Sequence, residues 1–219
     1  MLKTFRINER NTFCISLRNS EVRWMKMKDR FEREGYSVKR WIASTPAEVT
    51  DTFSDSLSPF QKACAQSHVR IWKHIVNRSL PYALILEDDA CFDRNWLLRL
   101  QEFIDSNKDS QWEGIFLNAS EPVQPAFTWV RAEEHVLAAG YILSLQGAKA
   151  ILETFKDCYY ASDWMTLILQ RRGHSYTYFP WLIIQEGEES QLGSPFKGDF
   201  KKVKDCLDTI GYSLDNYNV

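Results

Sequence analysis

The segment Tyr82-Ala-Leu-Ile-Leu-Glu-Asp-Asp-Ala90 decides the fold, because a short apolar run ends there in three consecutive carboxylates. Its first five residues are apolar throughout, as is typical of a strand that is buried on both faces of a parallel sheet. Open α/β sheets bind their ligands outside the carboxyl ends of such strands, where Glu87, Asp88 and Asp89 would lie. Adjacent carboxylates repel each other unless a cation or a proton intervenes, and hard divalent cations prefer oxygen ligands of this kind. The run therefore indicates a cation site, with a solvated acidic turn as the alternative.

Strand-like and helix-like patterns alternate along most of the chain. Strands are expected over residues 12–17, 36–42, 82–86, 113–117, 138–144 and 176–179, and helices over 20–34, 59–78, 95–106, 146–155 and 162–172. This alternation predicts an α/β fold with a mostly parallel central sheet flanked by helices. Residues 43–57 are expected to form a loop, and beyond Pro180 the pattern predicts no ordered element.

The helix expected over 59–78 has the clearest start, because Ser58 is placed to cap it and a proline occupies its first position. This helix precedes the acidic-ended strand, so the two are expected to pack antiparallel, with the start of the helix near the carboxylates. The spacing of apolar residues in the helix over 20–34 predicts a buried side formed by Val22, Met25 and Phe31.

Composition narrows the class of protein. The formal net charge is −2 and no basic block occurs, which argues against nucleic acid as a partner. The five cysteines are widely spaced and include no C-x-x-C pair, so reduced thiols in a cytosol-like compartment are expected. Residues 1–10 are polar, unlike a secretory signal, and the apolar runs are too short to span a bilayer. We therefore expect a cytoplasmic protein, peripheral at the inner face of a membrane at most.

Five segments in a fixed order carry a family resemblance. They are Ile15-Ser-Leu-Arg-Asn19 with Arg23; Leu57-Ser-Pro-Phe-Gln-Lys-Ala-Cys-Ala-Gln-Ser-His-Val-Arg-Ile-Trp72; Leu84-Ile-Leu-Glu-Asp-Asp-Ala90; Ala139-Gly-Tyr-Ile-Leu-Ser144 with Gly147-Ala148; and Asp163. They resemble the "I-N-L-x-R … R", "L-S-x-G-E-x-G-C-x-x-S-H-x-x-x-W", "I-L-E-D-D", "A-Y-L-I-S-x-x-G-A" and "P-x-D" motifs of glycosyltransferase family 25. The resemblance covers residues 12 to 194, nearly the whole chain.

The resemblance implies a GT-A-like fold and a single glycosyltransferase domain over 1–219, with a donor-binding half at 12–118, an acceptor-side half at 119–197 and a C-terminal tail at 198–219. It implies a nucleotide-sugar donor, usually UDP-galactose, inversion at the anomeric carbon, and a divalent cation, Mn²⁺ or Mg²⁺. Family 25 includes bacterial lipooligosaccharide β-galactosyltransferases and collagen-modifying enzymes. A glycan acceptor of the bacterial surface is the expectation, with a lipid-linked acceptor as the route to membrane contact, and a lysyl hydroxyl on a protein is the alternative.

By analogy with the D-x-D motif of GT-A enzymes, Asp89 is assigned as a direct metal ligand. Glu87 is assigned to the same metal site, through a metal-bound water, or to the ribose. Side chains alternate along an extended chain, so Asp88 is expected to point the other way, toward the donor sugar. The sequence leaves the division of roles among the three carboxylates open.

Four further residues are candidates for the site. Asp163 is the candidate base that deprotonates the acceptor hydroxyl, although an Asp at a helix start also serves as a cap. Arg18 and Arg23 are candidates for the diphosphate or the uracil pocket, with solvated arginines as the alternative. His68 is expected either to support the acidic loop beside the donor or to be a buried core histidine.

Three departures from the family pattern bear on these expectations. Ser16 replaces the Asn of the opening motif, and Phe60-Gln61 replaces a Gly-Glu pair. No histidine follows His174, so a late metal ligand would have to be a glutamate or water. A non-catalytic homologue that binds a nucleotide sugar or glycan therefore stays open, as does a metal-dependent phosphoesterase or nuclease, although the latter would call for more histidines or a basic groove.

Overall fold

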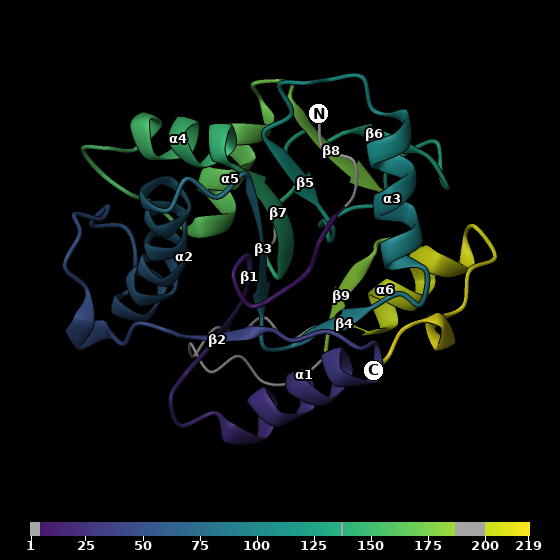
Figure 1. The fold of residues 1–219 in the computed structure, drawn as a ribbon, viewed down its shortest axis with the longest axis horizontal. Coiled ribbons are helices and arrows are strands. Elements are labelled where there is room, and N and C mark those ends of the chain that lie inside the picture. Colours follow the sequence, from purple (N-terminus) through teal and green to yellow (C-terminus); the bar gives the residue numbers. More distant parts are fainter. Residues whose placement is uncertain (1–4, 137, 187–199) are drawn as a thin grey trace.

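The computed structural model describes residues 5–136, 138–186 and 200–219, and its centre is one mixed β-sheet (Figure 1). The strands lie in the order β2 (Lys39–Ile42), β1 (Thr12–Ser16), β3 (Tyr82–Glu87), β7 (Gly140–Ser144), β5 (Gly114–Phe116), β8 (Ser175–Tyr178) and β6 (Trp129–Arg131). β1 is parallel to β2 and β3, and β5 is parallel to β8. β7 is antiparallel to both β3 and β5, and β6 is antiparallel to β8. All strands of this sheet except β7 and β6 therefore run in one direction, and the predicted mostly parallel sheet is confirmed.

Helices cover both faces of the sheet, as the α/β prediction requires (Figure 1). One face carries α2 (Pro59–Asn77), α4 (Leu145–Thr154) and α5 (Ser162–Gln170), and the other carries α1 (Glu21–Arg33) and α3 (Trp96–Ser106). Each helical layer encloses its own apolar cluster. The GT-A-like α/β class is thus confirmed, with the sheet as the partition between two cores.

β3 shows why an unbroken apolar run belongs at the centre. Ala83 and Ile85 face the cluster under α2, whereas Leu84 and Leu86 face the cluster under α1 and α3. All four side chains are buried. Side chains alternate across a strand, so a strand with helices on both sides is apolar at every position.

A second, two-stranded sheet continues from the acidic turn. β4 (Ala90–Phe92) pairs antiparallel with β9 (Ile183–Gln185), and α6 (Phe200–Asp208) packs beside this ribbon in a third apolar cluster. The sequence patterns predicted neither these strands nor β6 and α6. The strands have three residues each, too few for a period to be detected.

The start of α2 matches the prediction and explains one departure from the family motif. The Ser58 hydroxyl accepts a hydrogen bond from the Gln61 backbone N–H at 3.2 Å, and the Gln61 side chain accepts one from the Ser58 N–H at 2.9 Å. This reciprocal pair is a capping box. Gln61 therefore has a local structural role, while the neighbouring Phe60 is largely exposed. Residues 43–57 form the expected loop, apart from a short 3₁₀ helix at Pro46–Glu48.

The prediction for α1 is wrong for two of its three residues. Val22 is 73% exposed and Met25 is 44% exposed, whereas Phe31 is buried as expected. The inner face of α1 instead carries Met27 and Arg30. Arg30 faces inward because the carboxylate of Glu186 lies beneath the helix and pairs with it at 2.7 Å.

None of the helices in the described ranges is both long and apolar enough to cross a membrane. All five cysteines lie within these ranges and are free thiols. The division of the chain into donor-binding and acceptor-side halves stays a prediction.

Candidate active site

The three carboxylates lie where β3 ends and the chain turns into β4, but they do not alternate as expected. The Glu87 Oε1 atom lies 3.3 Å from His68 Nε2, on the side of α2. Asp88 and Asp89 both reach the Arg23 Nη2 atom on α1, at 2.7 and 3.2 Å. The strand geometry stops at Glu87, and the turn that follows brings Asp88 and Asp89 to the same guanidinium.

Arg23 is therefore the counter-cation of the acidic turn. Its side chain is only 13% exposed, so the ion pairs are shielded from water. Burial raises the pKa of Asp89 to about 7, the charge of Glu87 adds to this rise, and Arg23 opposes it. Burial likewise raises the pKa of Asp88, against the opposing effect of Arg23. One oxygen of Asp89, Oδ1, is buried without a hydrogen-bond partner among the described residues.

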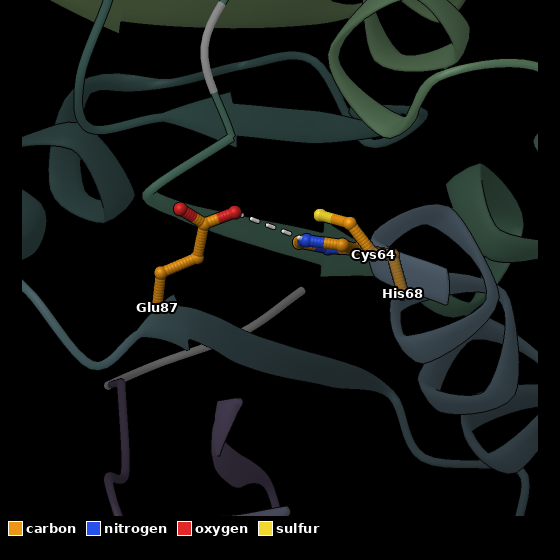
Figure 2. A group of neighbouring side chains, drawn as sticks. All are labelled: Cys64, His68 and Glu87. Carbon is orange, nitrogen blue, oxygen red and sulfur yellow. Dashed lines mark hydrogen bonds and ion pairs between the residues drawn. The ribbon is translucent and has the colours of Figure 1, made fainter. Parts of the chain in front are cut away.

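Glu87 belongs to a second cluster, with two residues of α2. Figure 2 shows Cys64 and His68 facing Glu87 from adjacent turns of the helix. The Cys64 Sγ atom, one His68 ring nitrogen and one Glu87 oxygen all lie within 4.8 Å of one another. The predicted antiparallel packing of the helix and the acidic-ended strand is confirmed by this contact.

His68 is fully buried and held from behind by a hydrogen-bonded chain. Its Nδ1 atom lies 2.9 Å from the hydroxyl of Tyr141, and the indole N–H of Trp72 donates to the same hydroxyl at 2.9 Å. The ring orientation is thus fixed, with Nε2 directed at Glu87. His68 is therefore a buried core histidine that also contacts Glu87, and its role beside the donor stays a prediction.

Asp163 lies in the first turn of α5, beside the start of α2. Ser162 and Asp163, at the start of α5, both lie near the Cys64 thiol. Burial and the charge of Glu87 raise the pKa of that thiol, and the nearby charge of Asp163 adds to the rise. The half-buried Asp163 accepts a hydrogen bond from the Trp164 backbone N–H at 2.8 Å. The structure therefore brings Asp163 toward the cluster of Figure 2, with a helix-start contact of its own.

Arg18 lies apart from the carboxylates. Its side chain is exposed after β1, and its backbone oxygen accepts a hydrogen bond from Arg40 at 3.3 Å. Thr45, through its backbone and hydroxyl, lowers the pKa of Glu48, and the charges of Arg70 and Arg18 contribute to this decrease. The charge of Arg18 thus acts on the 43–57 loop, whereas Arg23 on α1 pairs with the carboxylates of the acidic turn.

The sequence patterns missed a set of contacts beneath the turn. Glu186 pairs with Arg30 at 2.7 Å and with Lys26 at 3.0 Å, both on α1. Its backbone N–H donates to the Asp89 carbonyl at 2.7 Å. Glu186 therefore neutralises basic groups of α1, and the glutamates at 188 and 189 lie outside the described residues. The signal that could have revealed this is the helical spacing of Arg23, Lys26 and Arg30 on one side of α1.

Comparison with known proteins shows which family this chain resembles. The family model described as glycosyltransferase family 25 (LPS biosynthesis protein) matches residues 9–128. A Bos taurus protein named "Probable inactive glycosyltransferase 25 family member 3" is 29% identical over 106 residues, which are 44% of this chain and 18% of that protein. Human "Procollagen galactosyltransferase 2" is 29% identical over 99 residues, which are 41% of this chain and 16% of that protein. An Aedes aegypti "Glycosyltransferase 25 family member" is 25% identical over 166 residues, or 64% of this chain and 27% of that protein.

The chain thus spans less than a third of the length of each of these relatives. A solved structure of a glycosyltransferase involved in the glycosylation of the major capsid of PBCV-1 aligns with a TM-score of 0.44 and 11% identity, over 77% of this chain and 81% of that chain. The family match itself covers more than half of the chain and includes α2, the acidic turn and Arg23. On this match the chain belongs to glycosyltransferase family 25.

Proposed function

We propose that the protein is a metal-dependent inverting hexosyltransferase that moves galactose from UDP-galactose to a hydroxyl of a glycan acceptor of the lipooligosaccharide type. Family membership supports glycosyl transfer, and the relatives named as procollagen galactosyltransferases support galactose as the sugar. The observation that carries the proposal is the half-buried Asp89 at the carboxyl end of β3, whose buried Oδ1 atom has no hydrogen-bond partner in the described part of the chain. Ligands of α/β sheets bind at this edge.

The acidic turn fits a divalent cation. The Asp89 Oδ1 atom is buried and has no partner in the described part of the chain. One oxygen of Glu87 faces His68, and the other points away from the helix (Figure 2). Asp89 and Glu87 would hold Mn²⁺ or Mg²⁺, which are hard cations with a preference for carboxylate oxygen. When bound, such a cation stabilises the negative charge on the departing diphosphate.

Other residues of the chain activate the acceptor, bind the donor and hold Glu87 in position. Asp163 takes the proton of the acceptor hydroxyl as that oxygen forms its bond to the anomeric carbon, while the bond from this carbon to the UDP oxygen breaks. Arg23 stabilises the turn and faces the diphosphate, and Arg18, which lies apart from the turn in the segment after β1, contacts the donor from that side. Asp88 binds a hydroxyl of the donor sugar. His68 keeps Glu87 in place through the contact at 3.3 Å.

The donor half at 12–118 contains β1, α2 and the acidic turn, and the acceptor half at 119–197 contains α5 and Asp163. Both halves contribute strands to one sheet, since β7 of the second half lies between β3 and β5 of the first. We propose that the acceptor is bound at the α5 side of the cluster, with a lipid-linked glycan as the source of any membrane contact. The tail at 198–219 includes α6, which packs on the β4–β9 ribbon.

The test is a titration of the protein with UDP-galactose, UDP-glucose and GDP-sugars, with and without Mn²⁺, in which heat and released UDP are followed. We expect Mn²⁺-dependent binding of UDP-galactose with slow release of UDP. Asp163→Asn should lower turnover by about 10²- to 10⁴-fold while UDP binding persists, whereas the exposed Asp157→Asn serves as the matched control.

The competing functions give different results in the same experiment. Binding of UDP-galactose without turnover, in the presence of glycan acceptors, would identify a non-catalytic homologue, a role suggested by the relative named as inactive. Transfer to a hydroxylysine peptide but not to a glycan would identify a protein acceptor. Absence of binding to every nucleotide sugar would overturn the proposal.

A further inference from the structure

The cluster of Cys64, His68 and Glu87 has the composition of a transition-metal centre. Cys64 and His68 are four residues apart on α2, so their side chains leave the same face of the helix. Glu87 approaches them from the end of β3 (Figure 2). The three side chains supply one sulfur, one nitrogen and one oxygen, all within 4.8 Å of one another.

The spacing is close to what tetrahedral coordination needs. Zinc binds nitrogen and oxygen at roughly 2.0–2.2 Å, so two such ligands on one ion lie about 3.4 Å apart. The distance between His68 Nε2 and Glu87 Oε1 is 3.3 Å. The sulfur, at up to 4.8 Å, would have to move inward by about 1 Å to reach a zinc–sulfur distance of roughly 2.3 Å. A rotation of the Cys64 side chain can supply a shift of this size.

The surroundings of the cluster resemble the supporting contacts of metal ligands. A metal-bound histidine normally hydrogen-bonds through its other ring nitrogen, which fixes the ring and its tautomer. His68 does so through Nδ1, to the hydroxyl of Tyr141 at 2.9 Å, and Trp72 braces that hydroxyl. His68, the buried ligand of the three, therefore has an outer partner, whereas the half-buried Cys64 lies near Ser162 at the start of α5.

We propose that Cys64 Sγ, His68 Nε2 and Glu87 Oε1 bind one borderline divalent cation of the Zn²⁺, Co²⁺ or Fe²⁺ type. Thiolate and imidazole select such ions over Mg²⁺ and Mn²⁺. Binding releases the thiol proton to solvent. The Glu87 side chain is 27% exposed, so water or substrate would reach a fourth position on the ion from that side. This ion is distinct from the hard cation proposed at Asp89, and Glu87 would bridge the two sites with its separate oxygens.

The test is a titration of metal-free protein with Co²⁺, in which the near-ultraviolet absorption from thiolate-to-cobalt charge transfer is followed. We expect this absorption in the wild type, its loss in Cys64→Ser, and its retention in Cys158→Ser, which removes another half-buried cysteine far along the chain. Zn²⁺ should displace Co²⁺ and abolish the band, whereas excess Mg²⁺ should not. Tyr141→Phe should keep the band and weaken Co²⁺ binding by about 10- to 100-fold.

The inference is overturned if wild-type protein shows no thiolate band, or if Cys64→Ser keeps it. The three residues would then form a hydrogen-bonded support for Glu87 only. Should Cys64→Ser not fold, as judged by circular dichroism, Glu87→Gln provides the second variant, and unchanged Co²⁺ affinity in it would also refute the site. The readout needs no nucleotide sugar, so failure here leaves the glycosyltransferase proposal to its own titration.

Discussion

Replacing Asp89 by Asn should make the metal-free protein more stable at alkaline pH. In the unfolded chain this carboxyl titrates near 3.8, whereas in the folded protein burial and the charge of Glu87 raise its pKa to about 7. Between these two pH values the unfolded state loses its proton while the folded state keeps it. Stability therefore falls as pH rises through this window and levels off above the folded pKa. Asn keeps the shape of the side chain and removes the charge.

The size of the effect follows from the separation of the two pKa values. A difference of roughly three units corresponds to about 4 kcal/mol between the extremes of the window. Roughly a third of this change falls between pH 6 and pH 8, because titration of the folded state is centred there. Arg23 loses one of its two carboxylate partners in the variant but keeps Asp88 at 2.7 Å. We therefore expect a net gain of about 2–4 kcal/mol at pH 8.

The assay is urea unfolding at pH 6 and pH 8 with a chelator present, on wild type, Asp89→Asn and the exposed control Asp157→Asn. Wild type and the control should lose stability from pH 6 to pH 8, and Asp89→Asn should not share this loss. Addition of Mn²⁺ should stabilise the wild type and leave Asp89→Asn nearly unchanged. If the stability of Asp89→Asn changes with pH as much as that of the wild type, or is lower than that of the wild type at pH 8, the raised pKa of Asp89 is contradicted.

Substitutions at three other positions test the ion pairs of the acidic turn, the packing of α4 and the start of α2. Arg23→Met removes the shared partner of Asp88 and Asp89 and should lower the free energy of unfolding by about 3 kcal/mol at pH 8. This loss should be smaller at pH 5, where Asp89 is protonated. Equal losses at both pH values in urea unfolding would contradict the ion-pair account. Gly147→Ala places a methyl group 2.2 Å from the Glu113 carbonyl oxygen, so a loss of about 1–3 kcal/mol is expected, and an unchanged melting temperature would count against this close packing. Ser58→Ala removes the cap of α2 and should cost about 1 kcal/mol, while Ser58→Asp should retain most of the stability in the same melting experiment.

The sequence alone predicted those elements whose structure is set by one dominant physical effect. The unbroken apolar run of β3 follows from helices on both faces of the sheet, and the start of α2 follows from the capping box at Ser58. The order of helix and strand also placed the start of α2 beside Glu87. The expectation failed for Val22 and Met25, because a periodicity that counts only apolar residues cannot recognise a helix face built from Arg23 and Arg30.

The remaining differences between the predicted and the observed structure arise from pairings between distant parts of the chain. β4 pairs with β9, which lies more than 90 residues later, so neither three-residue strand has a local signal. The turn at Asp88 and Asp89 depends on the same pairing, because the Glu186 N–H holds the Asp89 carbonyl. Side-chain alternation could be predicted along β3 but not through a turn whose shape is set by β9. The proximity of Cys64 to Glu87 was missed for a similar reason, since the two residues belong to different elements.

The acidic turn has to keep its carboxylates neutralised in the metal-free protein and also keep an oxygen available for a ligand, and these two requirements conflict when no ligand is bound. Arg23 neutralises Asp88 closely, at 2.7 Å, and Asp89 less closely, at 3.2 Å, while one Asp89 oxygen is left buried without a partner in the described ranges. Leaving a buried acceptor unpaired costs about 1–3 kcal/mol. In the metal site that we propose, a cation would meet that oxygen on arrival and remove this cost. The same residues would then be unfavourable in the metal-free turn at alkaline pH and favourable once a cation is bound, so stability of Asp89 variants and cation binding should change in opposite directions.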